Sequence, residues 1–260
     1  MSTVDHIPVL ITIPLSHYCE KARWALDRLG VPYREEAHAP LVHRVFTMTL
    51  GGGTVPMLID GRRRIKTSGE ILKYAAAIDR RELLYPSDPD QRAEVESWEA
   101  RFDAHLGPHS RRWAYSQLLS NAALMRSLWT QRAPPAEAAI LRAVAPLVRA
   151  LVRSTYRITP ESSERSLARV HEMFRKVQAR LAEGCEYLVT ERFTAADLTF
   201  AVLAAPMLLP AQCRAVQPSL DQVPSRMRDE ILRLRESIAG QFALRLFERE
   251  RDRACAEIAE

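Results

Sequence analysis

The spacing of apolar residues changes once along this chain, at residues 83–90 (LLYPSDPD). Two prolines and two aspartates mark this short segment as a linker between structural units. Before it, apolar runs of strand length alternate with helical spacing, and after it only helical spacing occurs. The sequence therefore predicts an α/β domain over residues 1–80, a linker over 81–89 and an all-helical domain over 90–260.

The first domain is predicted to have the order strand, helix, strand, followed by strand, strand, helix. A buried strand is expected at 7–13, because the run IPVLITI is almost continuously apolar, and Ser16 then opens a helix. The pair Asp60-Gly61 predicts a tight hairpin turn. The other expected elements are strands at 31–37, 57–59 and 62–66, an irregular or weakly helical segment at 38–50, and a helix that is capped by Ser68 and has the core residues Ile71, Leu72, Ala75 and Ile78.

In the second half, helical spacing is clearest at residues 167–181 and 231–246. A further helix is predicted to start at Thr194 as the N-cap, with Asp197 reaching back to it and Phe193 packing on Leu198. The apolar run 193–210 contains Asp197 and Pro206. We therefore expect it to form a buried core helix rather than a membrane span.

The net charge is positive, at +5 from 37 Lys and Arg and 32 Asp and Glu. Only four of the basic residues are lysines, and the arginines are scattered among acids rather than gathered in a run. This distribution gives no support for a protein that binds nucleic acid or a membrane surface, and it fits attraction of anionic small molecules. We expect neither nucleic acid nor membrane as a partner.

Neither the cysteines nor the histidines predict a metal site. His105 and His109 are four residues apart, but Gly107-Pro108 between them breaks the helix that would align them. The four cysteines lie far apart, without CxxC spacing, and so indicate neither a zinc site nor a disulfide framework; they are Cys19, Cys185, Cys213 and Cys255.

Two features suggest a cytoplasmic location. Widely spaced cysteines without a disulfide framework suit a reducing compartment. The apolar run near the N-terminus is short and interrupted by Pro8 and Pro14, unlike a secretory signal.

Ser16 lies where the first predicted strand ends and the first predicted helix begins. Its hydroxyl and the free backbone N–H groups of the helix point to the same space, with the positive end of the helix dipole behind them. Such a place favours an anion. The alternative is that Ser16 only caps the helix, which is the usual role of a serine at this position.

Two further segments suggest a ligand. Val55-Pro56 stands at the start of a strand, where a cis proline leaves the backbone of Val55 free to pair with a peptide-like ligand. Thr67-Ser68 stands at a second helix N-terminus, which suits a carboxylate. Together with Ser16, these segments predict a cradle for an extended peptide that carries a thiol and a carboxylate.

These segments resemble the soluble glutathione transferase superfamily, and the resemblance extends over nearly the whole chain. The family implies an N-terminal thioredoxin-like domain and a C-terminal helical-bundle domain. The matching motifs are the active-site turn of serine-type members (Ser16-His17-Tyr18-Cys19), the cis-proline segment (Thr54-Val55-Pro56), the glutamate-serine motif (Thr67-Ser68 with Ile71 and Tyr74), the domain join (Leu84-Tyr85-Pro86 with Trp98) and the capping box from Thr194 to Asp197.

The resemblance also implies a role for each matching residue. Ser16 is the catalytic residue, whose hydroxyl donates a hydrogen bond to the sulfur of glutathione. Val55 pairs through its backbone with the cysteinyl part, Pro56 keeps that backbone turned outward, and Ser68 holds the γ-glutamyl carboxylate. Glutathione is then a co-substrate whose thiolate attacks an electrophilic small molecule, a reaction typical of detoxification, in a homodimer without a metal.

Some residues depart from the family pattern. Thr67 stands where the family usually has Glu or Asp, which weakens the partner for the ammonium group of glutathione or moves it elsewhere. Ser16 in place of a cysteine argues against disulfide exchange, and Cys19 is expected on the packed face of its helix. Tyr18 is an alternative source of the catalytic hydroxyl, since some relatives use a tyrosine.

The family places the electrophile pocket after the first long helix of the second domain, where Arg111, Arg112, Trp113 and Tyr115 lie. These residues are candidates for the pocket wall, and their alternative role is helix surface and packing. Residues 216–260 are expected to add helices that cover the pocket or an interface. A non-catalytic binding protein with the same fold is the alternative function, and Thr67 is the residue that favours it.

Overall fold

The computed structural model describes residues 7–79 and 81–251 of the 260-residue chain. The first domain has a four-stranded sheet in the order β2-β1-β3-β4, made of β1 (Val9–Thr12), β2 (Arg34–Ala37), β3 (Met57–Asp60) and β4 (Arg63–Ile65). β1 pairs in parallel with β2 and antiparallel with β3, and β3 and β4 form an antiparallel hairpin. This is the predicted thioredoxin-like domain, and Gly61 has the positive φ that the hairpin turn requires.

The strand register brings three chain segments to one edge of the sheet. Ile11, near the end of β1, lies opposite Met57 at the start of β3, and Leu58 lies opposite Ile65 at the end of β4. The cis Val55–Pro56 bond therefore lies beside the end of β1, where Ser16 follows. The start of the helix after β4 lies at the same edge, so the segments predicted to hold a peptide converge.

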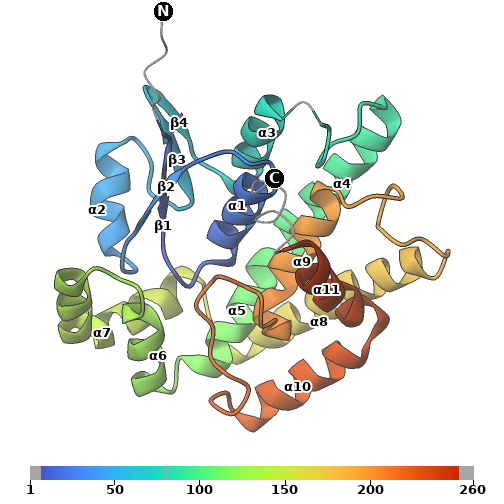
Figure 1. Ribbon diagram of the computed structural model, residues 1–260. Coiled ribbons are helices and arrows are strands. Elements are labelled where there is room, and N and C mark those ends of the chain that lie inside the picture. Colours follow the sequence, from blue (N-terminus) through green and yellow to red (C-terminus); the bar gives the residue numbers. More distant parts are fainter. Residues whose placement is uncertain (1–6, 80, 252–260) are drawn as a thin grey trace, which may run out of the picture.

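Three helices cover this sheet: α1 (His17–Arg28), α2 (Val42–Thr49) and α3 (Ser68–Ile78). α1 and α3 lie on one side of the sheet and α2 on the other (Figure 1). Cys19, Ala22 and Leu26 of α1 are fully buried, because their spacing of three and four places them on one helix face.

The structure corrects several local predictions in this domain. Thr67 rather than Ser68 caps α3, since its Oγ1 accepts from the backbone N–H of Glu70 while the Glu70 carboxylate accepts from that of Thr67. Ile78, in the last turn of α3, is 52% exposed rather than part of the core. Residues 42–49 form the regular helix α2. β2 begins three residues later than predicted, because the Val31 N–H bonds to the Leu26 carbonyl and closes the end of α1.

The second domain is helical, as predicted. Its helices in the described residues are α4 (Pro89–His105), α5 (Gly107–Leu118), α6 (Ala122–Thr130), α7 (Pro135–Thr155), α8 (Pro160–Leu181), α9 (Ala195–Leu208), α10 (Ser225–Glu236) and α11 (Ile238–Glu250). The predicted spacing at 231–246 is divided between α10 and α11, because Ser237 starts a new helix by accepting from the Gly240 N–H.

α9 is the central helix, and it contacts α1, α4, α5, α10 and α11. All its residues except Pro206 are buried. At its start, the Asp197 carboxylate accepts hydrogen bonds from the N–H groups of Thr194 and Leu188 at 2.8 and 2.9 Å, as the capping signal predicts for Thr194. Burial raises the pKa of Asp197 to about 6. None of the helices in residues 7–79 and 81–251 is long and apolar enough to cross a membrane.

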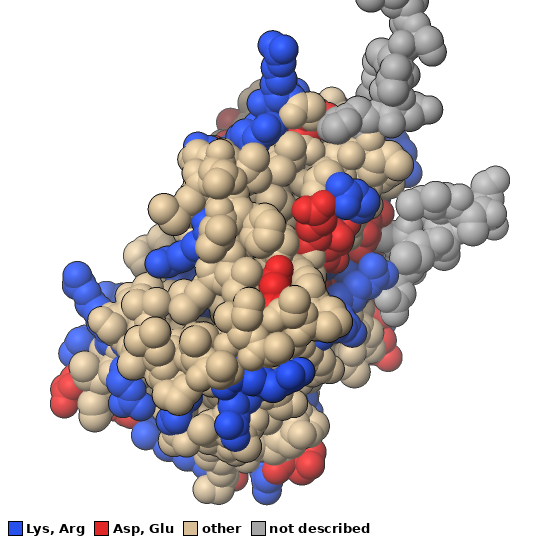
Figure 2. Space-filling view, turned by 90° about the vertical axis from the view of Figure 1, so that its left-hand side faces the viewer, with Lys and Arg blue, Asp and Glu red and all other residues tan. Residues whose placement is uncertain are grey.

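The side of the molecule formed by α2 and α7 carries few charges (Figure 2). Four apolar residues of α7, spaced by four, three and four positions, are exposed there: Ile140, Val144, Leu147 and Leu151. In α2, Val45, Phe46 and Met48 are exposed as well. Glu137 joins the two regions, because its carboxylate accepts from the backbone N–H of Ala39.

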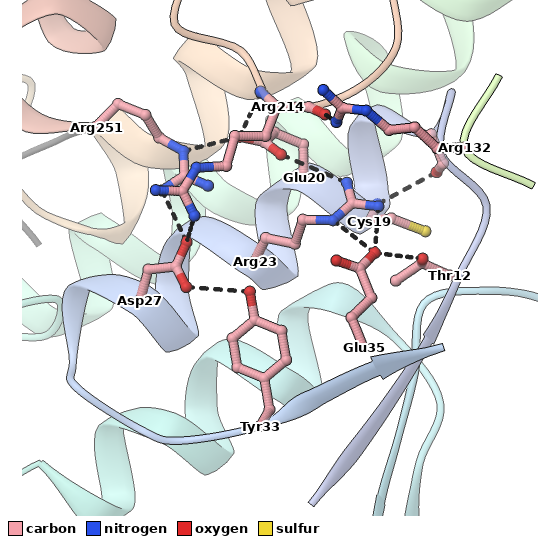
Figure 3. A network of polar contacts seen from close by, with 11 residues as sticks. Thr12, Cys19, Glu20, Arg23, Asp27, Tyr33, Glu35, Arg132, Arg214 and Arg251 are labelled. Carbon is pink, nitrogen blue, oxygen red and sulfur yellow. Dashed lines mark hydrogen bonds and ion pairs between the residues drawn. The ribbon is translucent and has the colours of Figure 1, made fainter. Parts of the chain in front are cut away.

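A network of ion pairs joins α1 to the end of the helical domain (Figure 3). Arg251 is fully buried and contacts Glu20 at 2.8 Å and Asp27 at 2.9 Å. Arg214, from the segment after α9, contacts Asp27 at 3.0 Å. This network holds α1, and with it the turn that starts at the end of β1, against the second domain.

Candidate active site

Ser16 is the N-cap of α1. Its Oγ accepts a hydrogen bond from the backbone N–H of Cys19 at 3.2 Å, and its side chain is half-buried. The Ser16 side chain also makes a hydrogen bond with the Cys19 thiol, which lowers the pKa of that thiol against the larger, opposite effect of burial. A donor at the positive end of a helix dipole is suited to hold an anion such as a thiolate.

An apolar pocket opens beside Ser16, between the two domains. It holds about 770 Å³ of space, counting the open solvent at its mouth. The backbone N–H of Val216 donates to the Pro14 carbonyl at 2.9 Å and so joins two of its walls. Most of the lining is aliphatic, and it includes Ile13, Leu15, Ala114, Leu118, Met125, Leu128, Ala205, Leu209 and Met227.

Among the described residues that line this pocket, Arg111 is the only charged one. Its guanidinium carbon lies 4.3 Å from the centroid of the Tyr156 ring and 5.6 Å from that of the Tyr18 ring. Arg111 forms no ion pair with any residue in the part of the chain that the structure describes, and its Nε is buried without a hydrogen-bond partner. The pocket therefore contains an unpaired positive charge.

His17 follows Ser16 and is buried. Its Nε2 donates to the Gly107 carbonyl at 3.2 Å, which fixes the neutral tautomer. Burial and the nearby Arg111 charge lower the pKa of His17 to about 3, and the hydrogen bond to Gly107 opposes part of that shift. His17 is therefore uncharged at neutral pH, and it is suited to position the turn rather than to exchange protons.

The three aromatic candidates from the sequence have different locations. Tyr115 lines the pocket, whereas Trp113 is fully buried in the core and does not line it. The helix explains this, because positions two apart point to opposite sides, while Arg111 and Tyr115, four apart, share a side. Tyr18 is also outside the pocket lining: its hydroxyl donates to the Asp103 carbonyl at 3.4 Å, and burial raises its pKa.

The predicted glutathione-binding segments lie at the sheet edge that also carries Ser16. The Val55–Pro56 peptide bond is cis, with Val55 half-buried and Pro56 buried. Ser68 is the first residue of α3 and is buried, and Thr67 is exposed. The Thr67 hydroxyl caps α3 and, being neutral, adds no negative charge at this position.

The cysteines near the site are not poised for reaction. Cys19 is fully buried, and burial raises the pKa of its thiol. Cys213 lines the pocket, but burial raises its pKa as well. Cys255 lies outside the described residues. Within residues 7–79 and 81–251, no group of three or more His, Cys, Asp or Glu residues is arranged to hold a metal ion.

Sequence reasoning missed part of the pocket wall. Tyr156, at the end of α7, stacks on Tyr115 with ring centroids 5.6 Å apart, and Gln217 comes from the loop after α9. No local pattern marks these residues, because tertiary packing brings them together. Val216, Gln217, Pro218 and Met227 line the pocket, in keeping with the expectation that residues 216–260 cover it.

Comparison with known proteins agrees with this architecture. The family model described as the glutathione S-transferase N-terminal domain matches residues 10–82, and that of the C-terminal domain matches residues 140–225. None of the curated proteins matches the sequence.

Solved structures share the fold at low sequence identity. Glutathione transferase F2 from Populus trichocarpa has a TM-score of 0.64 at 15% identity, with 96% of this chain and 98% of that chain covered. A Ceriporiopsis subvermispora glutathione S-transferase in complex with glutathione has a TM-score of 0.62 at 14% identity, with 94% and 97% covered. A possible glutathione S-transferase from Rhodopseudomonas palustris has 0.58 at 19% identity, with 94% of each chain covered. With two family models that together match more than half of its residues, the chain belongs to the glutathione S-transferase superfamily.

Proposed function

We propose that this protein is a glutathione transferase in which Ser16 stabilises the glutathione thiolate. The observation that carries the proposal is the position of the Ser16 hydroxyl, which lies at the N-terminus of α1 and lines an apolar pocket. The thiol proton passes to solvent, the thiolate forms a carbon–sulfur bond with an electrophile held in the pocket, and the leaving group departs with its electron pair.

The energy required for this activation is modest. A free thiol has a pKa near 8.5, and lowering it by about two units requires about 2.7 kcal/mol of preferential thiolate stabilisation. A hydrogen bond to a charged group contributes about 1.5–3 kcal/mol. The N-terminus of a helix such as α1 adds about 0.3–1 kcal/mol. Ser16 together with its helix is therefore sufficient.

The remaining contacts to glutathione are proposed at the same sheet edge. The backbone of Val55, turned outward by Pro56, pairs with the cysteinyl part, and Ser68 at the start of α3 holds the γ-glutamyl carboxylate. The positions of these segments at the end of β1 and the start of α3 support this arrangement.

Replacement of Ser16 tests the proposal. Ser16→Ala is expected to lower conjugation of 1-chloro-2,4-dinitrobenzene at pH 7 by about tenfold to a hundredfold, because one charge-assisted hydrogen bond is lost. The pKa of bound glutathione, followed by thiolate absorbance, should rise, while Ser16→Thr keeps a hydroxyl and retains much of the rate. Ser120→Ala, an exposed serine outside the pocket, is the control. An unchanged rate and thiol pKa in Ser16→Ala would remove Ser16 from the mechanism.

A non-catalytic binding protein is the second candidate. The observation that favours it is Thr67, which stands where the family has an acid and whose hydroxyl is engaged in the cap of α3. Retention on immobilised glutathione without turnover of any aryl halide would support this candidate. Retention with turnover would support the enzyme.

The homodimer and the cytoplasmic location are part of the proposal. The exposed apolar residues of α7, which share one helix face, offer a surface for contact with a second copy. Light scattering of the purified protein is expected to give twice the chain mass. A role in detoxification follows only from the proposed chemistry.

A further inference from the structure

We propose that the second substrate is an aromatic electrophile that carries a carboxylate, and that Arg111 binds this carboxylate in the pocket beside Ser16. The inference rests on the proposed function and specifies its substrate class. It starts from the composition of the pocket, in which one residue is positively charged, none is acidic and most are apolar. An apolar body with a single negative charge complements such a lining.

The surroundings of Arg111 leave its charge available. Its guanidinium group packs against the rings of Tyr156 and Tyr18, which hold it by cation–π contact without neutralising it. No carboxylate within residues 7–79 and 81–251 pairs with it. A partly buried cation without a counter-ion is costly in the free protein. A ligand carboxylate would satisfy it with two parallel hydrogen bonds, the geometry in which arginine differs from lysine.

The residues around Arg111 strengthen the positive field rather than weaken it. Arg112 donates from Nε to the Tyr156 carbonyl at 2.8 Å and from Nη1 to the Ser166 hydroxyl at 3.1 Å, so it fixes the end of α7 without adding an acid. Burial lowers the pKa of Arg112, and the positive charges of Arg111, Arg165 and Arg157 lower it further. Several positive charges therefore lie near this wall.

The aromatic character of the substrate is inferred from the lining next to Arg111. The rings of Tyr115 and Tyr156 are stacked with planes 18° apart, and the same pocket is lined by Leu118, Met125 and Leu128. Flat aromatic surfaces and aliphatic side chains favour a planar ring. A ring held there, with its carboxylate on Arg111, lies in the pocket that Ser16 lines.

Matched electrophiles test this proposal. 4-Chloro-3-nitrobenzoate and its methyl ester have the same leaving group and nitro group, and differ in one negative charge. The kcat/KM of each is divided by the rate constant of its uncatalysed reaction with glutathione, which removes their difference in intrinsic reactivity. The normalised preference for the carboxylate is expected to be about tenfold to a hundredfold, as for one charge-assisted hydrogen-bonded pair.

The variants assign the preference to Arg111. Arg111→Gln is expected to abolish it, Arg111→Lys to keep part of it, and Arg142→Gln to keep all of it. Arg142 is an exposed residue of α7 outside the pocket, so its replacement removes the same charge elsewhere. A wild-type preference at or below one, or a preference that persists in Arg111→Gln, would overturn the proposal. An equal loss for both electrophiles would also overturn it, because Arg111 would then act on glutathione.

A binding measurement separates failure of this inference from failure of the proposed function. Calorimetry with biphenyl-4-carboxylate and the neutral biphenyl-4-carboxamide requires no turnover. We expect the carboxylate to bind about tenfold to a hundredfold more tightly to the wild-type protein, and the difference to vanish in Arg111→Gln. If neither electrophile is conjugated but this difference is found, the anion site stands and the transferase does not. Equal binding of both compounds to the wild-type protein would contradict the anion site.

Discussion

α1 contacts the helical domain in two different ways. Along one side of the helix, Glu20 in the first turn and Asp27 in the last turn both meet the buried Arg251, and each charge has a partner of the opposite sign (Figure 3). At its N-terminal end, Ser16 faces an apolar pocket that contains one cation, Arg111, without such a partner. Both regions are interfaces between the same two domains.

The difference separates charges that hold the fold from a charge that is available to a ligand. A buried charge without a partner lowers stability. The presence of a partner of opposite charge is therefore explained by the need to stabilise the fold, without a ligand. Lys21 belongs with the paired group, since it contacts Glu99 and Asp103, each at 2.9 Å. Arg111 is not explained in this way, and we therefore interpret it as part of the binding site.

The largest effect is expected from Arg251→Met. It leaves Glu20, which is fully buried, with a weaker set of partners, and removing one member of a buried ion pair costs about 3–5 kcal/mol. Urea unfolding should therefore show a free energy of unfolding lower by that amount.

A matched control lies two residues earlier. Arg249 contacts Glu186 at 3.7 Å with both side chains more than half exposed, and Arg249→Met is expected to cost less than about 1 kcal/mol. If Arg251→Met were no more harmful than Arg249→Met, the network would not be what holds α1 to the helical domain.

The second effect concerns pH and the pocket end of α1. The pKa of His17 is about 3 in the folded protein, because of burial and Arg111, against about 6.5 when unfolded. Below pH 6.5 the unfolded chain binds a proton that the folded chain does not, so this residue lowers stability as the pH falls. Between pH 7 and pH 5 the loss amounts to about 2 kcal/mol.

His17→Gln keeps a donor for the Gly107 carbonyl and has no titrating group. The free energy of unfolding of this variant should fall less between pH 7 and pH 5 than that of the wild-type protein, by the same 2 kcal/mol. Parallel pH profiles for the two proteins would show that His17 titrates alike in the folded and unfolded states, which would contradict its lowered pKa.

Most of the fold could be predicted because its signals are local. The hairpin turn at Asp60-Gly61 and the start of α9 at Thr194 each depend on a few neighbouring residues, and both are present in the structure. The exposure of Ile78 was not predictable from helical spacing, because the spacing identifies a face but not where the covering element ends.

The pocket was predictable only in part. Helical spacing on α5 is sufficient to place Arg111 and Tyr115 on one side and Trp113 on the other, although the sequence analysis grouped all three. That Arg111 lacks a carboxylate partner could not be predicted, since Asp and Glu make up 32 residues of the chain and any of them could have approached it. Pairing of buried charges is decided by tertiary packing.

The smallest effect on stability is expected from Arg111→Met, and it completes the comparison with Arg251. Because Arg111 has no acidic partner to leave uncompensated, replacing it with an apolar side chain should change the free energy of unfolding by less than about 1 kcal/mol, as a gain rather than a loss. Binding of a ligand is expected to reverse this order, so that the wild-type protein becomes more stable than Arg111→Met. Biphenyl-4-carboxylate at one hundred times its dissociation constant stabilises the wild-type protein by about 2.7 kcal/mol, and at the same concentration it should stabilise Arg111→Met far less. Thermal unfolding of both proteins, with and without the compound, measures the two effects together. A loss of about 3 kcal/mol in the unliganded variant would place Arg111 among the residues that hold the fold, as Arg251 does, and the distinction between the two contact regions of α1 would not stand.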